Sequence, residues 1–339
     1  MNLIKLQTEF GTEEKCLEFL ERMRWPNGVR CVTCGSDKIS KFSTKEGTRK
    51  RKNTTTGEVE SKTVPARHLY QCLEPTCKQQ FTATAGTIYS NTHLPVQKWL
   101  AAIALVCNAK KGISAKQMQR DLGVTYKTAW YLNHRIREAM IGSAPAVFEG
   151  TVEADATFVG GKFDKRRKRA KYGKQAVFGL VQRKSETGHS KVYAQPVPIE
   201  TRPVVRGIIE DRVSETATVY TDEHPAYRFL RKTDRPHAIV IHSRGQYVDG
   251  TVHNNSVENF WSLFKRGLIG SFHQVSVKHL SRYLAEFTFR FNNREAENMF
   301  GMVVINLLAG IALEYKRLIS PPSPITSFAE LLPSGDEPS

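Results

Sequence analysis

The chain has 339 residues, 40% of them hydrophobic and 9% aromatic, so it is long enough for two or three domains with packed cores. Fifty lysine and arginine residues against 33 acidic residues give a net charge of +17, which is typical of a chain that neutralises nucleic-acid phosphates. No stretch reaches the roughly 18 apolar residues of a membrane span, and no secretory signal pattern begins the chain. These features exclude an integral membrane protein and predict a cytoplasmic one, although ribosomal and membrane-surface proteins are also basic.

Six cysteines in such a chain favour metal ligands or core thiols over disulfides. Cys16 and Cys107 lie in helical patterns and are expected in a core. The other four form two pairs, one with two residues between its members and one with four: Cys31 and Cys34, and Cys72 and Cys77. Two clipped pairs of thiolates suit tetrahedral zinc, so we predict a structural zinc site here, with isolated thiols as the alternative. A polar insertion over residues 45–66 separates the pairs.

A run of helices is predicted after the cysteines. Residues 95–110 have helical apolar spacing, and two shorter helices follow over residues 115–122 and from residue 126 to about Met140. The expected capping and turn residues are Ser114, Gly123 and Thr125. This spacing matches a helix-turn-helix, although helical domains that bind no DNA contain similar pairs. On the last of these helices, the side chains predicted to face outward and contact DNA are those of Tyr126, Lys127, Thr128, Tyr131 and Arg135.

Two predicted strands each carry an acidic residue, one after the apolar start of its strand and one at the strand end. Apolar and polar residues alternate over 151–159, which include Asp155, and a second strand over 217–222 ends at Asp222. Active sites of α/β proteins open at the carboxyl ends of strands.

A helix is predicted over residues 255–267, with Ser256 as its N-cap. Glu258 and Lys265 are seven residues apart and therefore share a face of this helix. An ordinary surface helix with a charge pair is the alternative. Together with Asp155 and Asp222, Glu258 can bind two hard cations, one to activate a hydroxyl and one to stabilise the leaving oxygen of a phosphoryl displacement. The chemistry indicated is cleavage and joining of DNA strands.

The densest charge run follows the Asp155 strand. Eight of the thirteen residues from Lys162 to Lys174 are basic, which predicts a loop that grips phosphates, with a solvated hairpin as the alternative. The residues expected to contact DNA are Lys165, Arg166, Arg167, Lys168 and Arg169.

The remaining elements complete an α/β pattern. Strands are predicted near 176–182 and 191–196, then a helix near 203–212, the Asp222 strand, a short helix and a strand at 238–242. This is the ribonuclease H-like order, a mixed sheet with flanking helices. We therefore predict a multidomain α/β protein: an N-terminal helix and zinc ribbon over 1–90, a helix-turn-helix over 91–145, a catalytic domain with C-terminal helices over 146–317, and a tail over 318–339.

From Cys16 to Leu313 the chain resembles the bacterial insertion-sequence DDE transposases of the zinc-ribbon, ISXO-type family. The stretches that carry the resemblance are Arg24-Trp25-Pro26-Asn27-Gly28 before Cys31, Gly86-Thr87-Ile88 with His93-Leu94-Pro95, Lys127-Thr128-Ala129-Trp130 with His134-Arg135-Ile136-Arg137, Val152-Glu153 with Asp155, Val159-Gly160-Gly161-Lys162, Thr221-Asp222-Glu223-His224, and Asn255-Ser256-Val257-Glu258 with Phe260-Trp261-Ser262-Leu263-Phe264-Lys265-Arg266-Gly267. The resemblance implies Asp155, Asp222 and Glu258 as ligands for magnesium or manganese and Lys265 near the DNA. Ala156 replaces an acidic residue of the family. Some relatives have asparagine at the third position, so Asn254, Asn255 and Asn259 are alternatives to Glu258.

The implied function is a transposase that binds the ends of an insertion sequence in double-stranded DNA and performs metal-dependent cleavage and strand transfer. The implied partners are terminal repeats, target DNA and further copies of the chain assembled on DNA, in a bacterial, nucleoid-associated setting. One alternative is a non-catalytic regulator that binds DNA through zinc and helix-turn-helix modules and has a degenerate nuclease-like domain. Another is a nuclease that cuts but does not join.

Overall fold

The computed structural model describes residues 1–44, 47–52, 59–64, 67–160, 163–164, 169–170, 174–185, 188–241, 248–249, 252–311 and 313–320. The chain divides into two compact units, one of Met1–Asn108 with Phe300–Ala312 and the other of Ala109–Met299 with Leu313–Ser339. Among the described residues, no helix is long and apolar enough to cross a membrane.

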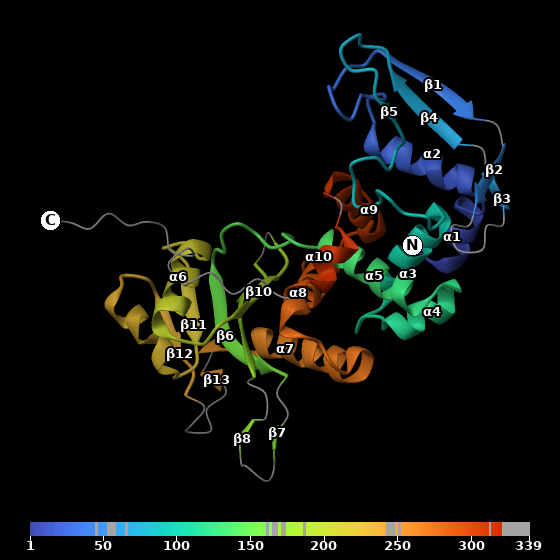
Figure 1. Cartoon of the computed structure of the whole chain (residues 1–339). Coiled ribbons are helices and arrows are strands. Elements are labelled where there is room, and N and C mark those ends of the chain that lie inside the picture. The colour runs from blue at the N-terminus through green and yellow to red at the C-terminus, as the bar shows by residue number, and fades with distance from the viewer. Residues whose placement is uncertain are drawn as a thin grey trace. The chain divides into compact units, whose positions relative to one another are not determined.

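The first unit combines helices with a small antiparallel sheet (Figure 1). Its helices are α1 (Leu3–Glu9), α2 (Glu13–Arg24), α3 (Val96–Asn108) and α9 (Met299–Ala309), and its sheet has the order β1 (Ile39–Thr44), β4 (Arg67–Cys72) and β5 (Gln80–Phe81). A separate hairpin, β2 (Gly47–Lys52) with β3 (Val59–Val64), lies within the predicted insertion. Tyr70 and Phe81 pack with Trp25 beside two of the cysteines, so aromatic rings supply the small core.

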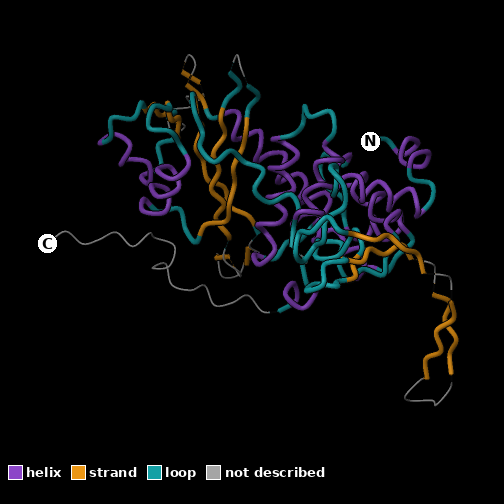
Figure 2. Tube along the Cα trace, turned by 90° about the horizontal axis from the view of Figure 1, so that it is seen from above, coloured by secondary structure: helices purple, strands orange, loops and turns teal. Residues whose placement is uncertain are grey.

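The second unit is built on a five-stranded mixed sheet, seen on edge among helices in Figure 2. The strand order is β10 (Lys191–Val197), β9 (Gln175–Gln182), β6 (Thr151–Val159), β11 (Thr218–Thr221) and β12 (His237–Ile239). β9 is antiparallel to both of its neighbours, β10 and β6, whereas β6, β11 and β12 run parallel to one another. The predicted mixed α/β architecture is therefore confirmed.

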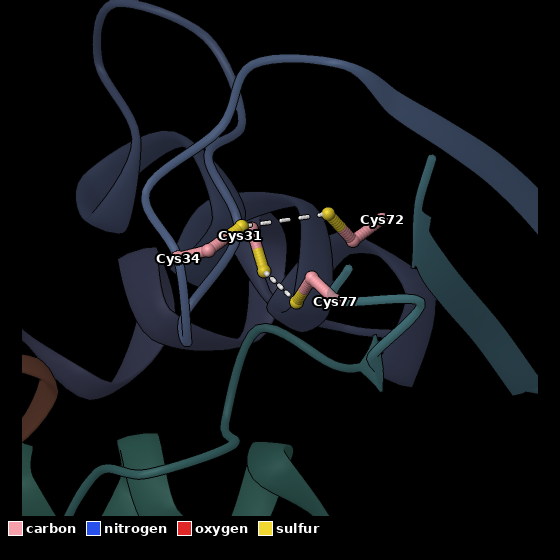
Figure 3. A group of neighbouring side chains, drawn as sticks. All are labelled: Cys31, Cys34, Cys72 and Cys77. Atoms are coloured by element: carbon pink, nitrogen blue, oxygen red, sulfur yellow. Dashed lines mark hydrogen bonds between the residues drawn. The ribbon is translucent and has the colours of Figure 1, made fainter. Parts of the chain in front are cut away.

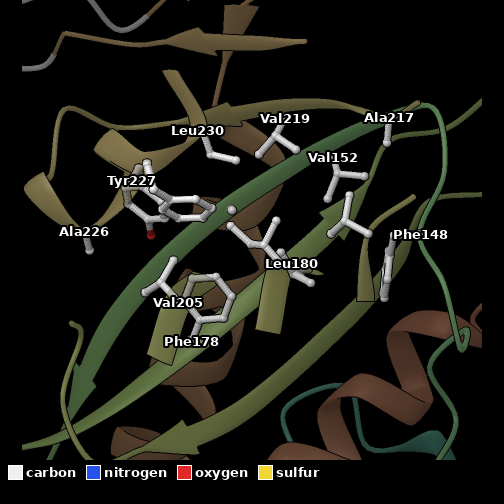
Figure 4. Close-up of a cluster of buried hydrophobic side chains, with 14 of the residues drawn as sticks. Phe148, Val152, Phe178, Leu180, Val205, Ala217, Val219, Ala226, Tyr227 and Leu230 are labelled. Carbon is white, nitrogen blue, oxygen red and sulfur yellow. The ribbon is translucent and has the colours of Figure 1, made fainter. Parts of the chain in front are cut away.

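Helices cover both faces of this sheet. On one face, α6 (Arg202–Arg212) and the 3-10 helix η1 (Pro225–Lys232) pack against Val152, Phe178 and Leu180, as Figure 4 shows. On the other face, α7 (Asn255–Gly267), a π-helical turn η3 (Leu268–Phe272) and α8 (Val277–Asn292) form a second core that is rich in phenylalanine. The sheet is buried on both sides, which matches the apolar run over residues 176–181 in β9.

The remaining elements of this unit are short. The paired helices α4 (Ala115–Leu122) and α5 (Tyr126–Glu138) precede β6, and α10 (Tyr315–Ile319) follows the other elements. Four further short strands form two pairs: β7 (Phe163–Asp164) with β8 (Arg169–Ala170), and β13 (Val248–Asp249) with β14 (Val252–His253). The predicted phosphate contacts Lys165, Arg166, Arg167 and Lys168 lie outside the described residues, as does the side chain of Arg169.

Candidate functional site

The central strand β6 sends alternate side chains to opposite faces of the sheet. Val152 and Ala154 enter the core under α6 and η1. Glu153 and Asp155 point to the other face, where each makes hydrogen bonds to α7. Two carboxylates of one strand therefore face the helix that carries Glu258.

Asp155 is half-buried against α7. The indole of Trp261 donates a hydrogen bond from Nε1 to Asp155 Oδ2 at 3.0 Å. Gly179 lies opposite Asp155 in the register of β6 and β9, and a Cβ at that position would be 2.5 Å from the Trp261 ring. The missing side chain of Gly179 thus makes the space in which the indole reaches Asp155.

Asp222 follows the end of β11, which runs parallel to β6 as its neighbour. Its Oδ1 accepts a hydrogen bond from the backbone N–H of His224 at 2.9 Å, which fixes the turn after the strand. Burial and then the negative charge of Asp222 raise the pKa of Asp155 to about 7. The two carboxylates therefore interact electrostatically, and a cation between them would relieve that repulsion.

Glu258 and Lys265 are exposed on α7. They lie three residues before and four residues after Trp261, so the spacing puts all three on one side of the helix, the side from which Trp261 contacts Asp155. Among the described residues, a group of side chains placed to hold a metal ion is found at four cysteines and not at Asp155, Asp222 and Glu258.

Glu200 is a carboxylate beside this site that the sequence reasoning missed. It lies between β10 and α6, and its Oε1 is 3.3 Å from Nδ1 of His224. Burial raises the pKa of Glu200, the nearby His224 lowers it, and the negative charge of Asp222 raises it further. The buried Tyr227 hydroxyl interacts with Glu200, Asp155 and Asp222, and its pKa is raised mainly by burial. An acidic residue just after a strand was the available signal, as it was for Asp222.

A cavity of about 160 Å³ opens beside Asp222. Its lining includes His224 and Tyr227 together with two guanidinium groups, those of Arg228 and Arg231. Carboxylate and arginine side chains in one cavity provide groups for both a cation and a phosphate.

Four cysteines of the first unit converge, as Figure 3 shows. The Sγ atoms of Cys31, Cys34, Cys72 and Cys77 all lie within 4.8 Å of one another, and two cross-pairs, Cys31 with Cys77 and Cys34 with Cys72, are each 3.6 Å apart. A hydrogen bond from the Cys34 backbone is the main cause that lowers the pKa of Cys31, to about 6. Tight turns at Gly35 and Lys78, both at positive φ, bring each pair together. The arrangement fits the predicted tetrahedral zinc site.

The helices α4 and α5 have the predicted caps and turn. Ser114 Oγ accepts from the Gln117 N–H, Thr125 Oγ1 accepts from the Thr128 N–H, and Gly123 is left-handed with φ 58°. Ser256, by contrast, was wrongly predicted as an N-cap. Asn254 occupies the cap position of α7, and Ser256 lies inside the helix with its hydroxyl on Glu153.

The outer face of α5 differs from the prediction. Lys127 is exposed, but its Nζ lies 4.5 Å from the ring centre of Tyr315 in α10, and the Tyr131 hydroxyl donates to the Leu313 carbonyl. Thr128 is half-buried. The expectation that Arg135 faces outward is wrong, because it is 3% exposed with its guanidinium over the Tyr131 ring. Residues 132–137 of α5 are buried, and its exposed side chains, Tyr126 and Lys127, lie in the first turn.

Comparisons with known proteins match both halves of the chain. An ISXO2-like transposase domain model matches residues 147–292, and a transposase zinc-ribbon domain model matches residues 11–80. An uncharacterized protein in transposable element ISH50 of Halobacterium salinarum is 28% identical over 298 residues, which are 83% of this chain and 91% of that protein. An uncharacterized transposase-like protein of Haemophilus influenzae is 30% identical over 113 residues, 33% of this chain and 90% of that protein.

Proposed function

This chain belongs to the family of ISXO2-like transposases, and we propose that it binds the ends of an insertion sequence and catalyses metal-dependent DNA cleavage and strand transfer. The observation that carries the proposal is the pairing of Asp155 and Asp222 on neighbouring parallel strands, beside a helix that bears Glu258. The strand order, with three antiparallel strands followed by two parallel ones, supports a ribonuclease H-like catalytic domain over residues 146–317.

In the proposed mechanism, Asp155 and Asp222 would bind two magnesium or manganese ions from the end of the sheet, and Glu258 would bind one from α7. The cations would supply Lewis-acid activation of a hydroxyl and stabilisation of a leaving oxygen. The indole of Trp261 holds Asp155 Oδ2 in place, and Lys265 presents an ammonium to the DNA phosphates. Water would attack the phosphodiester at the element end and displace the 3′-oxygen of the element strand as a hydroxyl. That 3′-hydroxyl would then attack a target phosphodiester and displace a 3′-hydroxyl of the target strand.

Three further parts of the chain are proposed to bind zinc or DNA. The four cysteines would bind one structural zinc, and the zinc ribbon over residues 1–90 would fold around it. The helix-turn-helix over residues 91–145 would read element ends through the first turn of α5, and the basic run over residues 162–174 would bind phosphates whatever the sequence. Several copies would assemble on the two ends of an element, in a nucleoid-associated complex.

The test compares Asp155→Asn and Asp222→Asn with Asp234→Asn, a matched change at an exposed position. Purified protein is incubated with magnesium and DNA that carries the element ends with their flanks. Loss of a ligand removes several kcal/mol of charge stabilisation, so both site variants should cleave at least about 100-fold more slowly while still binding the ends. Cleavage at the wild-type rate by either site variant would contradict the proposal.

The third ligand is tested separately. Glu258→Gln should lose cleavage as the two aspartate variants do, and Asn259→Ala should keep it. The opposite result would move the third ligand to Asn259. End binding without any cleavage by the wild-type protein, in magnesium or manganese, would favour the non-catalytic regulator.

A further inference from the structure

Glu153 is a fully buried carboxylate two residues before Asp155 on the same strand face. Its Oε1 accepts from Arg183 Nε at 2.6 Å and from Ser256 Oγ at 2.9 Å. Its Oε2 accepts from the backbone N–H groups of Ser256 at 2.8 Å and Val257 at 2.9 Å. A buried charge is costly unless it is paired and hydrogen-bonded, and Glu153 satisfies both conditions.

These contacts replace the usual cap of α7. The first N–H groups of a helix have no partner within the helix, and the N-cap Asn254 makes no side-chain hydrogen bond to them. Glu153 reaches them from a strand 103 residues earlier in the chain. The carboxylate therefore fastens the beginning of α7 to β6.

A second polar contact fastens the same helix one turn further along. Trp261 donates to Asp155, so β6 contacts α7 through Glu153 at Val257 and through Asp155 at Trp261. Glu258 lies between these two points. Because an α-helix rises 1.5 Å per residue and turns 100°, two fixed points on one strand set both the translation and the rotation of α7. The position of Glu258 relative to Asp155 follows from them.

Arg183 links this pair to Asp222. Its Nη2 donates to the carbonyl of His253 at 2.6 Å, just before α7 begins. Asn254 follows, and its side-chain oxygen accepts from the Asp222 N–H at 3.2 Å in the amide orientation that satisfies its neighbours. The residues that lead into α7 are thus tied to the strand end that carries Asp222.

We propose that Glu153 is a positioning residue of the carboxylate site, whose contacts to α7 set the register that places Glu258 beside Asp155. The inference rests on the proposed function, since Glu258 must be a ligand for its position to matter. A buried ion pair is weak evidence for stability, because apolar side chains of the same size often stabilise as well. Directional hydrogen bonds on either side of Glu258 instead fix one register, which apolar packing does less well.

The test measures manganese binding by the zinc-loaded full chain. The concentration of free Mn²⁺ is measured by electron paramagnetic resonance, and quenching of tryptophan fluorescence reports an ion bound near Trp261. Glu153→Gln should raise the Mn²⁺ dissociation constant by about 10- to 100-fold, the usual effect of changing a group that orients a ligand. Glu153→Asp keeps the charge and the Arg183 pair, but its side chain is too short to reach α7 fully, so it should raise the Mn²⁺ dissociation constant by a smaller factor. This variant tests the positioning role if the glutamine variant does not fold.

Glu286→Gln is the matched control. Glu286 is equally buried, but it pairs with Arg137 of α5 at 2.6 Å and with Arg290 of its own helix α8, and not with α7. This variant should lose stability and keep the wild-type Mn²⁺ affinity. Cleavage by the Glu153 variants should recover in part at high Mn²⁺, which a loss of stability alone would not produce.

The outcomes separate the two proposals. Wild-type Mn²⁺ affinity in both Glu153 variants, with affinity lost in Asp155→Asn, would overturn the positioning role and leave the proposed function intact. Wild-type affinity and quenching in Asp155→Asn would instead overturn the metal site itself. An equal loss of affinity in Glu286→Gln would show that the effect of Glu153 is only one of stability.

Discussion

Adding a single methyl group at Gly179 should displace Trp261 from Asp155. A Cβ on Gly179 would lie 2.5 Å and 2.7 Å from two carbons of the Trp261 ring. Ordinary carbon contacts are about 3.5 Å, so the ring must retreat by about 1 Å. Trp261 is only 3% exposed and belongs to the phenylalanine-rich core on this face of the sheet. We therefore expect Gly179→Ala to lower the free energy of unfolding by about 1–3 kcal/mol, the usual cost of overpacking, and to break the 3.0 Å hydrogen bond to Asp155.

A double-mutant cycle measures this clash by urea unfolding. Trp261→Phe removes the ring atoms that the new methyl group meets. Gly179→Ala should then cost little in the Trp261→Phe background, so the cycle should give a coupling energy of about 1–3 kcal/mol. Gly207→Ala is the control, since Gly207 lies on α6 with no atom within 4 Å of an added Cβ. That change should stabilise the protein by about 0.5–1 kcal/mol.

The cleavage assay extends the prediction from stability to the site. Gly179→Ala should cleave DNA more slowly than wild type while the Gly207 control cleaves normally. Additive stability effects of Gly179→Ala and Trp261→Phe would refute the reasoning, because they would mean that the indole does not lie over Gly179.

Three further predictions concern other parts of the molecule. Elemental analysis should find about one zinc per chain, lost in Cys72→Ser and in Cys77→Ser, and an unchanged zinc content in either would remove that residue from the ligand set. Burial lowers the pKa of His134 to about 2 and that of His279 to about 4. Between about pH 6.5 and pH 4, therefore, these histidines bind protons in the unfolded chain but not in the folded one. The free energy of unfolding should fall as the pH drops through this range. In His134→Gln the acid slope of urea stability should decrease by about 1.4 kcal/mol per pH unit, and an unchanged slope would contradict this. Tyr315→Ala should release Lys127 from its cation–π contact, which is worth about 0.5–1 kcal/mol, and so tighten binding to element ends by about twofold to fivefold in a gel-shift assay. Weaker binding would show that α10 contributes to the DNA surface.

The elements around the site were predictable because local patterns determine them. The strand over 151–159 was predicted with the bounds that the structure has, and the helix that carries Glu258 was predicted with its correct end at Gly267. Each combines a regular apolar period with a clear stop. The caps Ser114 and Thr125 were also predictable, since a cap depends on neighbours within three residues.

The two errors have a common cause in distant contacts. Ser256 has the sequence features of an N-cap, but Glu153 takes over the capping role from β6, so the helix begins earlier. Arg135 lies on the face of α5 that its spacing predicts to be exposed, yet the fold buries it. Glu200 was missed for the same reason, because only the folded chain brings it near Asp222.

The same face of β6 holds two carboxylates with opposite electrostatic settings, and this contrast supports their assignment to different roles. Glu153 is paired with a guanidinium and accepts three hydrogen bonds from α7 as well, so its charge is fully compensated. Asp155 accepts one side-chain hydrogen bond, from Trp261, and burial beside Asp222 raises its pKa to about 7. A compensated carboxylate gains nothing from a cation, whereas a buried carboxylate near a second one gains most. Residue type and strand alternation do not distinguish Glu153 from Asp155. The ion pair of Glu153 with Arg183, which is 30 residues further along the chain, distinguishes the structural acid from the one available to metal.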